Sequence, residues 1–375
     1  DAADWLPLDT KSNNFDNFGD AQSLSPTLLE AYLNAAGEIS RMAVGNDRAP
    51  QINTTYTNPN YISQHPWDHV AGAPYGTRGG MVINHHFAAD AQYHLEMTFS
   101  MGNNSRGHDI DVSIDGEHAQ TLQYERYDRG VSLQTETFLI PAGQHQVSVA
   151  FVRRAEGPYE DLIRPHDWSQ AGGGSGGAGI TTLPHLKDLV VVGPYNITGI
   201  SETVSREKIF TCRPISMEEE VSCASEILGN LAAKAYRRPL VPGELEGIMG
   251  FYDDSRKEEG FEVAIRTGLE AILASPHTIF RLEREMDVAS GENYEISDLE
   301  LASRLGVFLW NSLPDQQLLD VAGQGRLRDL DELEKQTRRM LREPKAEALG
   351  SRFAHQWLRL HLLQLENQVY QHNLY

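Results

Sequence analysis

Three aspartates that lie close together in the sequence carry the oxygen ligands that a hard cation prefers. Asp109 and Asp111 alternate along one predicted strand, and Asp115 follows at the end of that strand. Calcium takes about six to eight oxygen ligands, so these residues predict a calcium site. The spacing lacks the glycine and the terminal glutamate of an EF-hand loop, and the alternative is a strand face exposed to water.

Aromatic residues between the predicted strands form a second candidate site. Sugars present apolar CH faces that stack on aromatic rings, while their hydroxyl groups need polar or charged partners. The predicted glycan-binding residues are Trp67, Asp68, Tyr124, Tyr127 and Arg129. Other aromatic residues in these segments are Tyr56, Tyr61, Tyr75, Tyr159 and Trp168. The alternative is that the rings cap the core or pack against neighbouring domains.

Four histidines flank this region. His65 and His69 have the spacing at which two helical histidines share a metal, but Pro66 lies between them and favours a polar loop. His85 and His86 are neighbours in a predicted strand and therefore face opposite sides of it. At most one of this second pair points into any one site.

No motif of a familiar catalytic class occurs in the sequence. The chain lacks Gly-x-Ser-x-Gly, His-Glu-x-x-His and Walker patterns. The glycine-rich tract at residues 171–179 lacks the Lys-Ser/Thr pair of a phosphate loop and predicts a flexible loop. We therefore assign no catalytic residue.

Composition excludes two classes of partner. The chain has 32 basic and 53 acidic residues and a formal net charge of −21, which repels polyphosphate and argues against nucleic-acid binding. No apolar run approaches the roughly 20 residues of a membrane-spanning helix, and no signal peptide precedes Asp1. With 375 residues, more than one domain is expected.

The two cysteines, Cys212 and Cys223, do not have the spacing of a zinc site or a thioredoxin motif. A structural disulfide is favoured over two free thiols, and closing this short loop contributes about 3 kcal/mol in the chain-entropy model. A disulfide favours an oxidising compartment. The predicted location is therefore the periplasm or the outside of the cell.

Residues 49–200 show the alternation of half-buried antiparallel strands. The apolar residues of two such runs are Tyr93, Leu95, Met97 and Phe99, then Ile110, Val112 and Ile114. Asp115 and Gly116 follow as a type I′ hairpin turn, which needs two positive φ angles. The segment Pro141–Val152 resembles the final hairpin of jelly-roll carbohydrate-binding modules. We predict a β-sandwich of this type.

Helical patterns flank the predicted sandwich. Ser216 with Glu219, and Ser297 with Glu300, have the spacing of a capping box, and a further helix is predicted over residues 345–363. The expected class is α+β, with an antiparallel sandwich inserted between all-α domains. The predicted domains are residues 1–48 (helical), 49–200 (sandwich), 201–290 (helical, with the disulfide) and 291–375 (the first part of a second helical domain).

Several short peptides occur in an order that resembles one family. They are Asn14–Asn17, Ser23–Ala36, Ile209–Pro214, Cys223–Leu240, Leu301–Asp315 and Phe353–Leu360. The order is similar to that of the planctomycete-type secreted proteins built from serial domains of unknown function, which are usually linked to a c-type cytochrome domain. The resemblance implies that both ends of the chain are truncated. It implies a c-type haem only if an upstream domain carries the Cys-x-x-Cys-His motif, which is absent here.

The resemblance and the residues together predict a non-catalytic binding and scaffolding part of a cytochrome-linked protein, with the sandwich contacting glycan or a protein partner. One alternative is a haem-dependent oxidoreductase that acts on polysaccharide, with its redox centre outside this chain. The other alternative is a structural subunit of an electron-transfer complex. Calcium is the one cofactor that the residues themselves suggest.

Overall fold

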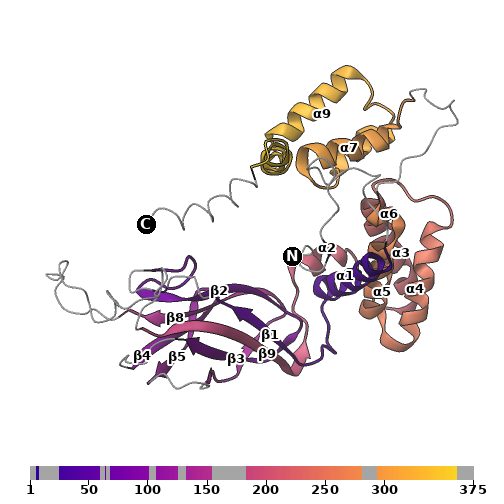
Figure 1. Cartoon of the computed structure of the whole chain (residues 1–375). Coiled ribbons are helices and arrows are strands. Elements are labelled where there is room, and N and C mark those ends of the chain that lie inside the picture. Colours follow the sequence, from indigo (N-terminus) through magenta and orange to yellow (C-terminus); the bar gives the residue numbers. More distant parts are fainter. Residues whose placement is uncertain are drawn as a thin grey trace. The chain divides into compact units, whose positions relative to one another are not determined.

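The computed structural model describes residues 6–7, 25–59, 64, 68–100, 107–125, 132–153, 183–280 and 294–360. The chain divides into two compact units (Figure 1). One unit, Arg41–Glu207, contains the strands, and the other, which combines Asp1–Ser40 with Lys208–Tyr375, is helical in its described parts.

The strands form two antiparallel sheets that pack as a sandwich. The five-stranded sheet has the order β1 (Ile52–Thr57), β9 (His185–Gly199), β3 (Asp90–Ser100) and β6 (Ser132–Gln134), and β7 (Phe138–Ile140) also pairs with β3. The four-stranded sheet has the order β2 (Thr77–Phe87), β8 (Gly143–Val152), β4 (His108–Ile114) and β5 (Glu117–Tyr124). The predicted α+β class with an antiparallel sandwich is confirmed.

The core of the sandwich follows the predicted alternation. The inward residues of β3 are Tyr93, Leu95, Met97 and Phe99, and all four are buried. They meet inward residues of the opposite sheet such as Ile110, Val112 and Phe151. Burying a large apolar side chain contributes about 1.5–3 kcal/mol, so this alternation fixes the register of both sheets.

The two ends of the sandwich have different connections. At one end, Thr77 of β2 pairs with Val152 of β8, and His108 of β4 pairs with Tyr124 of β5. The strands that end here are joined by the longer connections, which are residues 58–76, 101–107, 125–131 and 153–184. We call this the long-loop end. At the other, the short-turn end, two residues join β2 to β3, β4 to β5 and β7 to β8. The turn at Asp115 (φ 52°) and Gly116 (φ 80°) has the two positive φ angles that the sequence predicted.

The helical unit contains two groups of helices in addition to α1 (Pro26–Val44), whose first turn is capped by Ser25. The first group is α2 (Val204–Ile209), α3 (Met217–Tyr236), α4 (Glu244–Glu259), α5 (Phe261–Ala274) and α6 (Pro276–Ile279). The second group is α7 (Asp298–Trp310), α8 (Gln316–Gly323), α9 (Leu330–Arg342), a 3₁₀ turn Pro344–Ala346, a π-helical turn Leu349–Ala354 and α10 (His355–Trp357).

The helix starts agree only partly with the sequence signals. Ser297 and Glu300 form the complete capping box at the start of α7. Ser216 caps α3, but the carboxylate of Glu219 accepts from the backbone N–H of Ile215 instead of Ser216. The continuous helix predicted over residues 345–363 is wrong, because the described part to Leu360 is broken into 3₁₀, π and short α turns.

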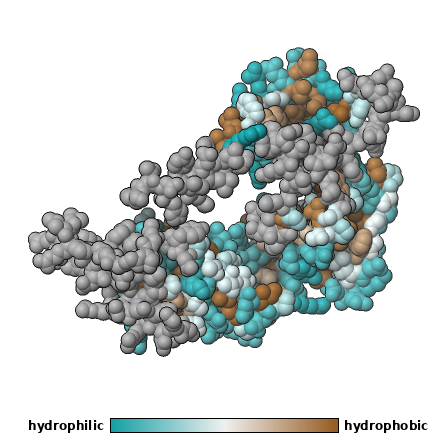
Figure 2. Space-filling model, in the orientation of Figure 1, coloured by the Kyte–Doolittle hydropathy of each residue, from teal (hydrophilic) through white to brown (hydrophobic). Residues whose placement is uncertain are grey.

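Cys212 and Cys223 form the predicted disulfide, with Cα atoms 5.9 Å apart. Cys212 lies in the segment after α2, and Cys223 is buried in α3. The bond therefore attaches the segment that leads into the helical unit to its longest described helix. Among the described helices, none is both long and apolar enough to cross a membrane. On the coloured residues of Figure 2, hydrophilic areas alternate with smaller hydrophobic ones.

Candidate functional site

The structure places only some of the predicted glycan-binding residues. Trp67, Tyr127 and Arg129 lie outside the described residues. Tyr124 is 4% exposed, and its ring packs against Phe99 with the centroids 4.8 Å apart. The prediction that Tyr124 offers a ring to a ligand is wrong, because this last residue of β5 points into the core.

A fully exposed ring lies in the segment that leads from Asp68 to β2. Tyr75 is 99% exposed and stacks on His69, with centroids 5.9 Å apart and an angle of 11° between the ring planes. His69 also contacts the carbonyl oxygen of Ala73 through Nε2 at 3.1 Å. We call Tyr75 and His69 the Tyr75 platform. The tyrosine ring lies parallel to the His69 ring and remains almost wholly accessible, so it is available to a ligand.

The loop that carries the platform is attached closely to the four-stranded sheet. Gly72, with φ +90°, approaches the sheet so closely that a Cβ would lie 3.2 Å from Val82 and 3.3 Å from Gln146. Thr77 Oγ1 donates to the carbonyl of Pro74 at 2.6 Å. These contacts hold the loop on both sides of Tyr75, so the backbone that carries the platform is attached to the sheet.

Below the platform, a buried amide joins two segments of the long-loop end. Gln64 is 2% exposed, and its Nε2 donates to the carbonyl of Leu186 at 2.9 Å. Its Oε1 accepts from the backbone N–H groups of Leu186 and Gly80 at 3.0 and 3.1 Å. One side chain thereby ties the start of β9 to β2, and it uses its donor and acceptor groups as a buried amide must.

A buried cation supports the same base. Arg78 is 3% exposed, its guanidinium lies 4.5 Å above the ring centroid of Phe151, and its Nη1 donates to the carbonyls of Gln64 and Pro184. The ring face and the carbonyl oxygens provide the negative potential that a buried guanidinium needs. The long-loop end therefore has a rigid base.

The three aspartates predicted to bind calcium do not converge. Asp111 accepts from Ser113 Oγ at 2.5 Å and lies 2.7 Å from His118 Nδ1. Asp115 lies 2.6 Å from His145 Nδ1, and Asp109 lies at the start of β4. Within the part of the chain that the structure describes, no three His, Cys, Asp or Glu side chains are grouped to hold a metal.

Asp115 and two histidines belong to the short-turn end. Burial alone raises the pKa of Asp115, but the hydrogen bonds from His145 and from the N–H of Gln146 lower it overall. On the adjacent strand, His85 Nδ1 lies 2.9 Å from the hydroxyl of Tyr56 in the opposite sheet. Burial, with the charge of the neighbouring His86, lowers the pKa of His85 to about 4. These groups join strands to one another.

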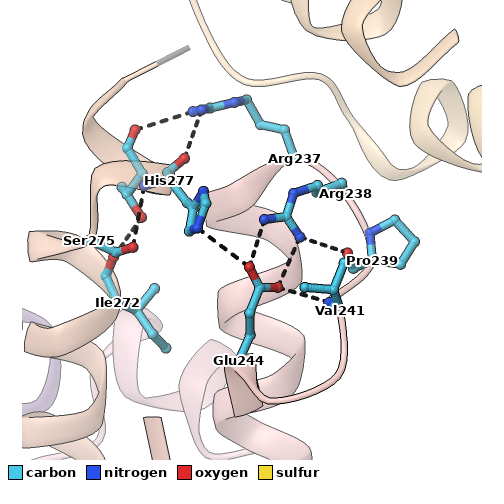
Figure 3. Close-up of polar contacts among 9 residues, drawn as sticks. Arg237, Arg238, Pro239, Val241, Glu244, Ile272, Ser275 and His277 are labelled. Carbon is cyan, nitrogen blue, oxygen red and sulfur yellow. Dashed lines mark hydrogen bonds and ion pairs between the residues drawn. The ribbon is translucent and has the colours of Figure 1, made fainter. Parts of the chain in front are cut away.

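In the helical unit the densest polar cluster lies where α3 ends (Figure 3). Arg238 binds Glu244 through two hydrogen bonds of 2.9 and 2.7 Å, and the N–H of Val241 donates to the same carboxylate. The hydrogen bond from Arg238 lowers the pKa of Glu244 to about 2. This pair holds the start of α4 against the end of α3.

The neighbouring arginine has a different role from the one its sequence position suggests. A basic residue in the last turn of a helix is expected to oppose the helix dipole. Arg237 instead has left-handed backbone (φ 61°), and its guanidinium donates to the carbonyls of His277, Thr278 and Phe280. It satisfies the carbonyls at the end of α6, so the cluster is structural.

The residues present do not fit a covalent c-type haem. Such a haem is attached through the cysteines of a Cys-x-x-Cys-His motif, whereas the two cysteines of this chain are joined to each other and leave no free thiol.

Comparison with known structures finds sugar-binding proteins at low similarity. The CBM36-1 domain of a multidomain xylanase from the hindgut metagenome of Trinervitermes trinervoides is 12% identical, with 40% of this chain and 100% of that chain covered and a TM-score of 0.22. A family 35 carbohydrate-binding module from an environmental isolate is 9% identical, with 40% and 91% covered and a TM-score of 0.21. Scores this low say nothing about which ligand this chain binds.

Comparison with protein families is more informative. Among curated proteins, none matches this chain. Three models of families of unknown function do match: DUF1587 at residues 1–45, DUF1595 at 223–283 and DUF1592 at 296–375. Their order is the one that the short peptides of the sequence indicated. The three matches are serial domains of unknown function of the planctomycete-type proteins that the sequence resembles.

Proposed function

We propose that this chain is a non-catalytic binding and scaffolding part of a larger secreted protein, and that its sandwich binds a glycan at the long-loop end. The observation that carries the proposal is the Tyr75 platform, a fully exposed tyrosine stacked on His69, the residue that follows Asp68 in the sequence. An exposed aromatic ring offers an apolar face on which the CH face of a sugar can stack.

The base of the long-loop end supports this assignment. Binding residues are often carried on loops that a rigid scaffold positions. Here Gln64 and Arg78 hold the scaffold, and the platform loop is attached at Gly72 and Thr77. A ligand that stacks on Tyr75 therefore meets a ring on a loop whose backbone is already held in place.

Two further observations support a secreted scaffold. The disulfide between Cys212 and Cys223 is typical of an oxidising compartment, which is why we propose the periplasm or the outside of the cell. The cluster at the end of α3, with Arg238 bound to Glu244 and Arg237 to the carbonyls at the end of α6, joins helix ends, as expected of a scaffold. A cytochrome domain, as in relatives, is the proposed neighbour of this scaffold.

The proposal is tested by affinity electrophoresis of the full chain against neutral and acidic polysaccharides. Tyr75→Ala is expected to weaken retardation about thirtyfold, the effect of losing a dominant aromatic contact of roughly 2 kcal/mol, whereas Tyr75→Phe keeps the ring and most of the binding. Tyr294→Ala removes an exposed tyrosine of the helical unit and serves as the matched control.

Two outcomes contradict parts of the proposal. If none of the polysaccharides retards the wild-type protein, the proposal of glycan binding is wrong. If Tyr75→Ala and Tyr294→Ala lose the same amount of retardation, the Tyr75 platform is not the binding site. Repeating the gels with a calcium chelator tests the cation predicted from Asp109, Asp111 and Asp115: loss of retardation supports it, and unchanged retardation contradicts it.

A further inference from the structure

The outer face of the five-stranded sheet carries a row of oxygen-bearing side chains that no function has yet used. Thr57 of β1 pairs with Asp188 of β9, Asp188 pairs with Thr98 of β3, and Thr98 pairs with Ser132 of β6. Each residue lies on the side of its strand that points away from the core, because their neighbours Tyr56, Leu189, Met97 and Leu133 belong to the core or pack against it. We call these four residues the polar ladder.

The ladder is held in place by its own hydrogen bonds. Thr57 Oγ1 donates to Asp188 Oδ1 at 2.8 Å, and Thr98 Oγ1 donates to Asp188 Oδ2 at 2.6 Å. Burial raises the pKa of Asp188, but the bonds from Thr98 and Thr57 and the charge of Lys187 lower it overall. The carboxylate is ionised and fixes both hydroxyl hydrogens, so the threonine oxygens face a ligand as acceptors.

The spacing of the ladder matches that of a sugar chain. Adjacent strands of a sheet lie about 4.8 Å apart, which is close to the length of one sugar ring in an extended chain. An extended polysaccharide that crosses the strands at right angles therefore meets one ladder side chain for each sugar. The hydroxyl groups of such a chain can donate hydrogen bonds to the ladder oxygens. Because these acceptors are already held in position before binding, the entropic cost of binding is lower.

A ring pair lies on the same face. Tyr195 is partly buried and stacks on His94 with centroids 5.7 Å apart and an angle of 17° between the planes. The hydroxyl of Tyr195 accepts from Gln51 Nε2 at 2.8 Å. The ring is thus fixed on this face, but it lies about six residues along β3 from the polar ladder, since Tyr195 pairs with Gln92 whereas Asp188 pairs with Thr98.

Charge decides which glycan this face accepts. Asp188 is ionised, Glu96 lies in the next row of the same face with its side chain 41% exposed, and the nearby Lys187 pairs with Asp188 at 3.4 Å. Carboxylated or sulfated chains are repelled by such a face. We propose that the polar ladder is a second glycan site, distinct from the Tyr75 platform, and that it binds an uncharged extended polysaccharide laid across the strands.

The test is isothermal titration calorimetry of the full chain with cellohexaose, xylohexaose and mannohexaose. Thr57→Val combined with Ser132→Ala removes the two ends of the ladder at exposed positions and leaves Asp188 bound to Thr98. We expect about fivefold weaker binding for each lost hydroxyl, about 25-fold in total. Thr55→Val combined with Gln134→Ala changes the next row of the same strands and is the matched control, with an expected change below about twofold.

Each result is decisive. A ladder variant that binds like wild type, or that loses no more affinity than the control pair, overturns the ladder, and so does a wild type that binds none of the three hexasaccharides. Binding of a sulfated galactan that the ladder variant abolishes contradicts the charge argument. The affinity of Tyr75→Ala is measured in parallel. If this variant binds like wild type while the ladder variant binds more weakly, the polar ladder is supported and the Tyr75 platform is contradicted. Thermal melts confirm that the variants fold.

Discussion

The long-loop end and the short-turn end belong to one sandwich, but different side chains hold them together. At the long-loop end, a buried amide and a buried guanidinium, Gln64 and Arg78, satisfy backbone groups of separate segments. At the short-turn end, the carboxylates of Asp90 and Asp115 bind the backbone of adjacent connections. In this sandwich the long connections are held by buried side chains that satisfy backbone groups, whereas the short connections are held by carboxylates near the surface.

The largest expected effect breaks the base of the long-loop end. Gly80→Ala places a Cβ on the carbonyl oxygen of Val149 at a position with φ +85°, so we expect a loss of roughly 4 kcal/mol in the free energy of unfolding. Gly76→Ala is the matched control, because it has nearly the same φ of +84° and nothing within 4 Å of the new Cβ. Urea unfolding of both variants separates the steric cost from the cost of φ. Equal losses contradict the close approach.

The next effect tests the short-turn end. Asp90 accepts from the N–H groups of Ala142 and Ser201 and from the hydroxyl of Ser201. Asp90→Ala leaves these donors without their acceptor and is expected to cost about 2–3 kcal/mol, whereas Asp90→Asn keeps one oxygen and costs about half as much. Thermal melts of the two variants check this. An Asp90→Ala variant as stable as wild type shows that the turn does not depend on the carboxylate.

A pH titration sharpens the comparison between the two ends. Because the folded-state pKa of His85 is lowered from 6.5 to about 4, the unfolded chain binds a proton first, so stability present above about pH 6.5 is lost as the pH falls toward 4. The loss from this group is on the order of 3 kcal/mol. The carboxylates with lowered pKa values, Asp90 and Asp115, lose their contribution only at lower pH.

His85→Gln is expected to flatten the stability curve between pH 6.5 and 4, as measured by urea unfolding at a series of pH values. Tyr56→Phe is the control, since it removes the hydroxyl partner and keeps the imidazole. If the curve of His85→Gln has the same slope as that of wild type, another group titrates there.

The smallest effect concerns the turn between β4 and β5. Asp115→Ala removes the bonds to His145 and to the N–H of Gln146, and it also places alanine at φ 52°. Since the carboxylate is half exposed, the expected cost is only about 1 kcal/mol. Asp115→Asn tolerates the same φ and keeps an acceptor, so its melting temperature should lie between those of Asp115→Ala and wild type.

Local sequence rules predict the parts of this fold that local physics decides. Strand alternation on β3 and the turn at Asp115 and Gly116 follow from side-chain period and φ preference. The pairing of Cys212 with Cys223 follows from their number and short separation. Such features need no knowledge of distant segments.

The candidate site was harder to predict because exposure is decided by tertiary contacts. Tyr124 and Tyr75 both lie at the borders of strands, yet the first is buried and the second is exposed. Tyr75 stands between Pro74 and Gly76, which is a signal for the tip of a turn. The polar ladder could not be predicted from β3 alone, because it depends on the register between strands that are distant in sequence.

The disulfide has a mechanical consequence. A scaffold that holds a polysaccharide at one point and other domains at another is loaded by tension along its chain. The bond between Cys212 and Cys223, 11 residues apart, carries that tension past the first turns of α3. Unfolding the helical unit by force therefore releases roughly 35 Å less chain than the same unit releases after reduction. The protein lengthens less before its remaining helices resist the pull.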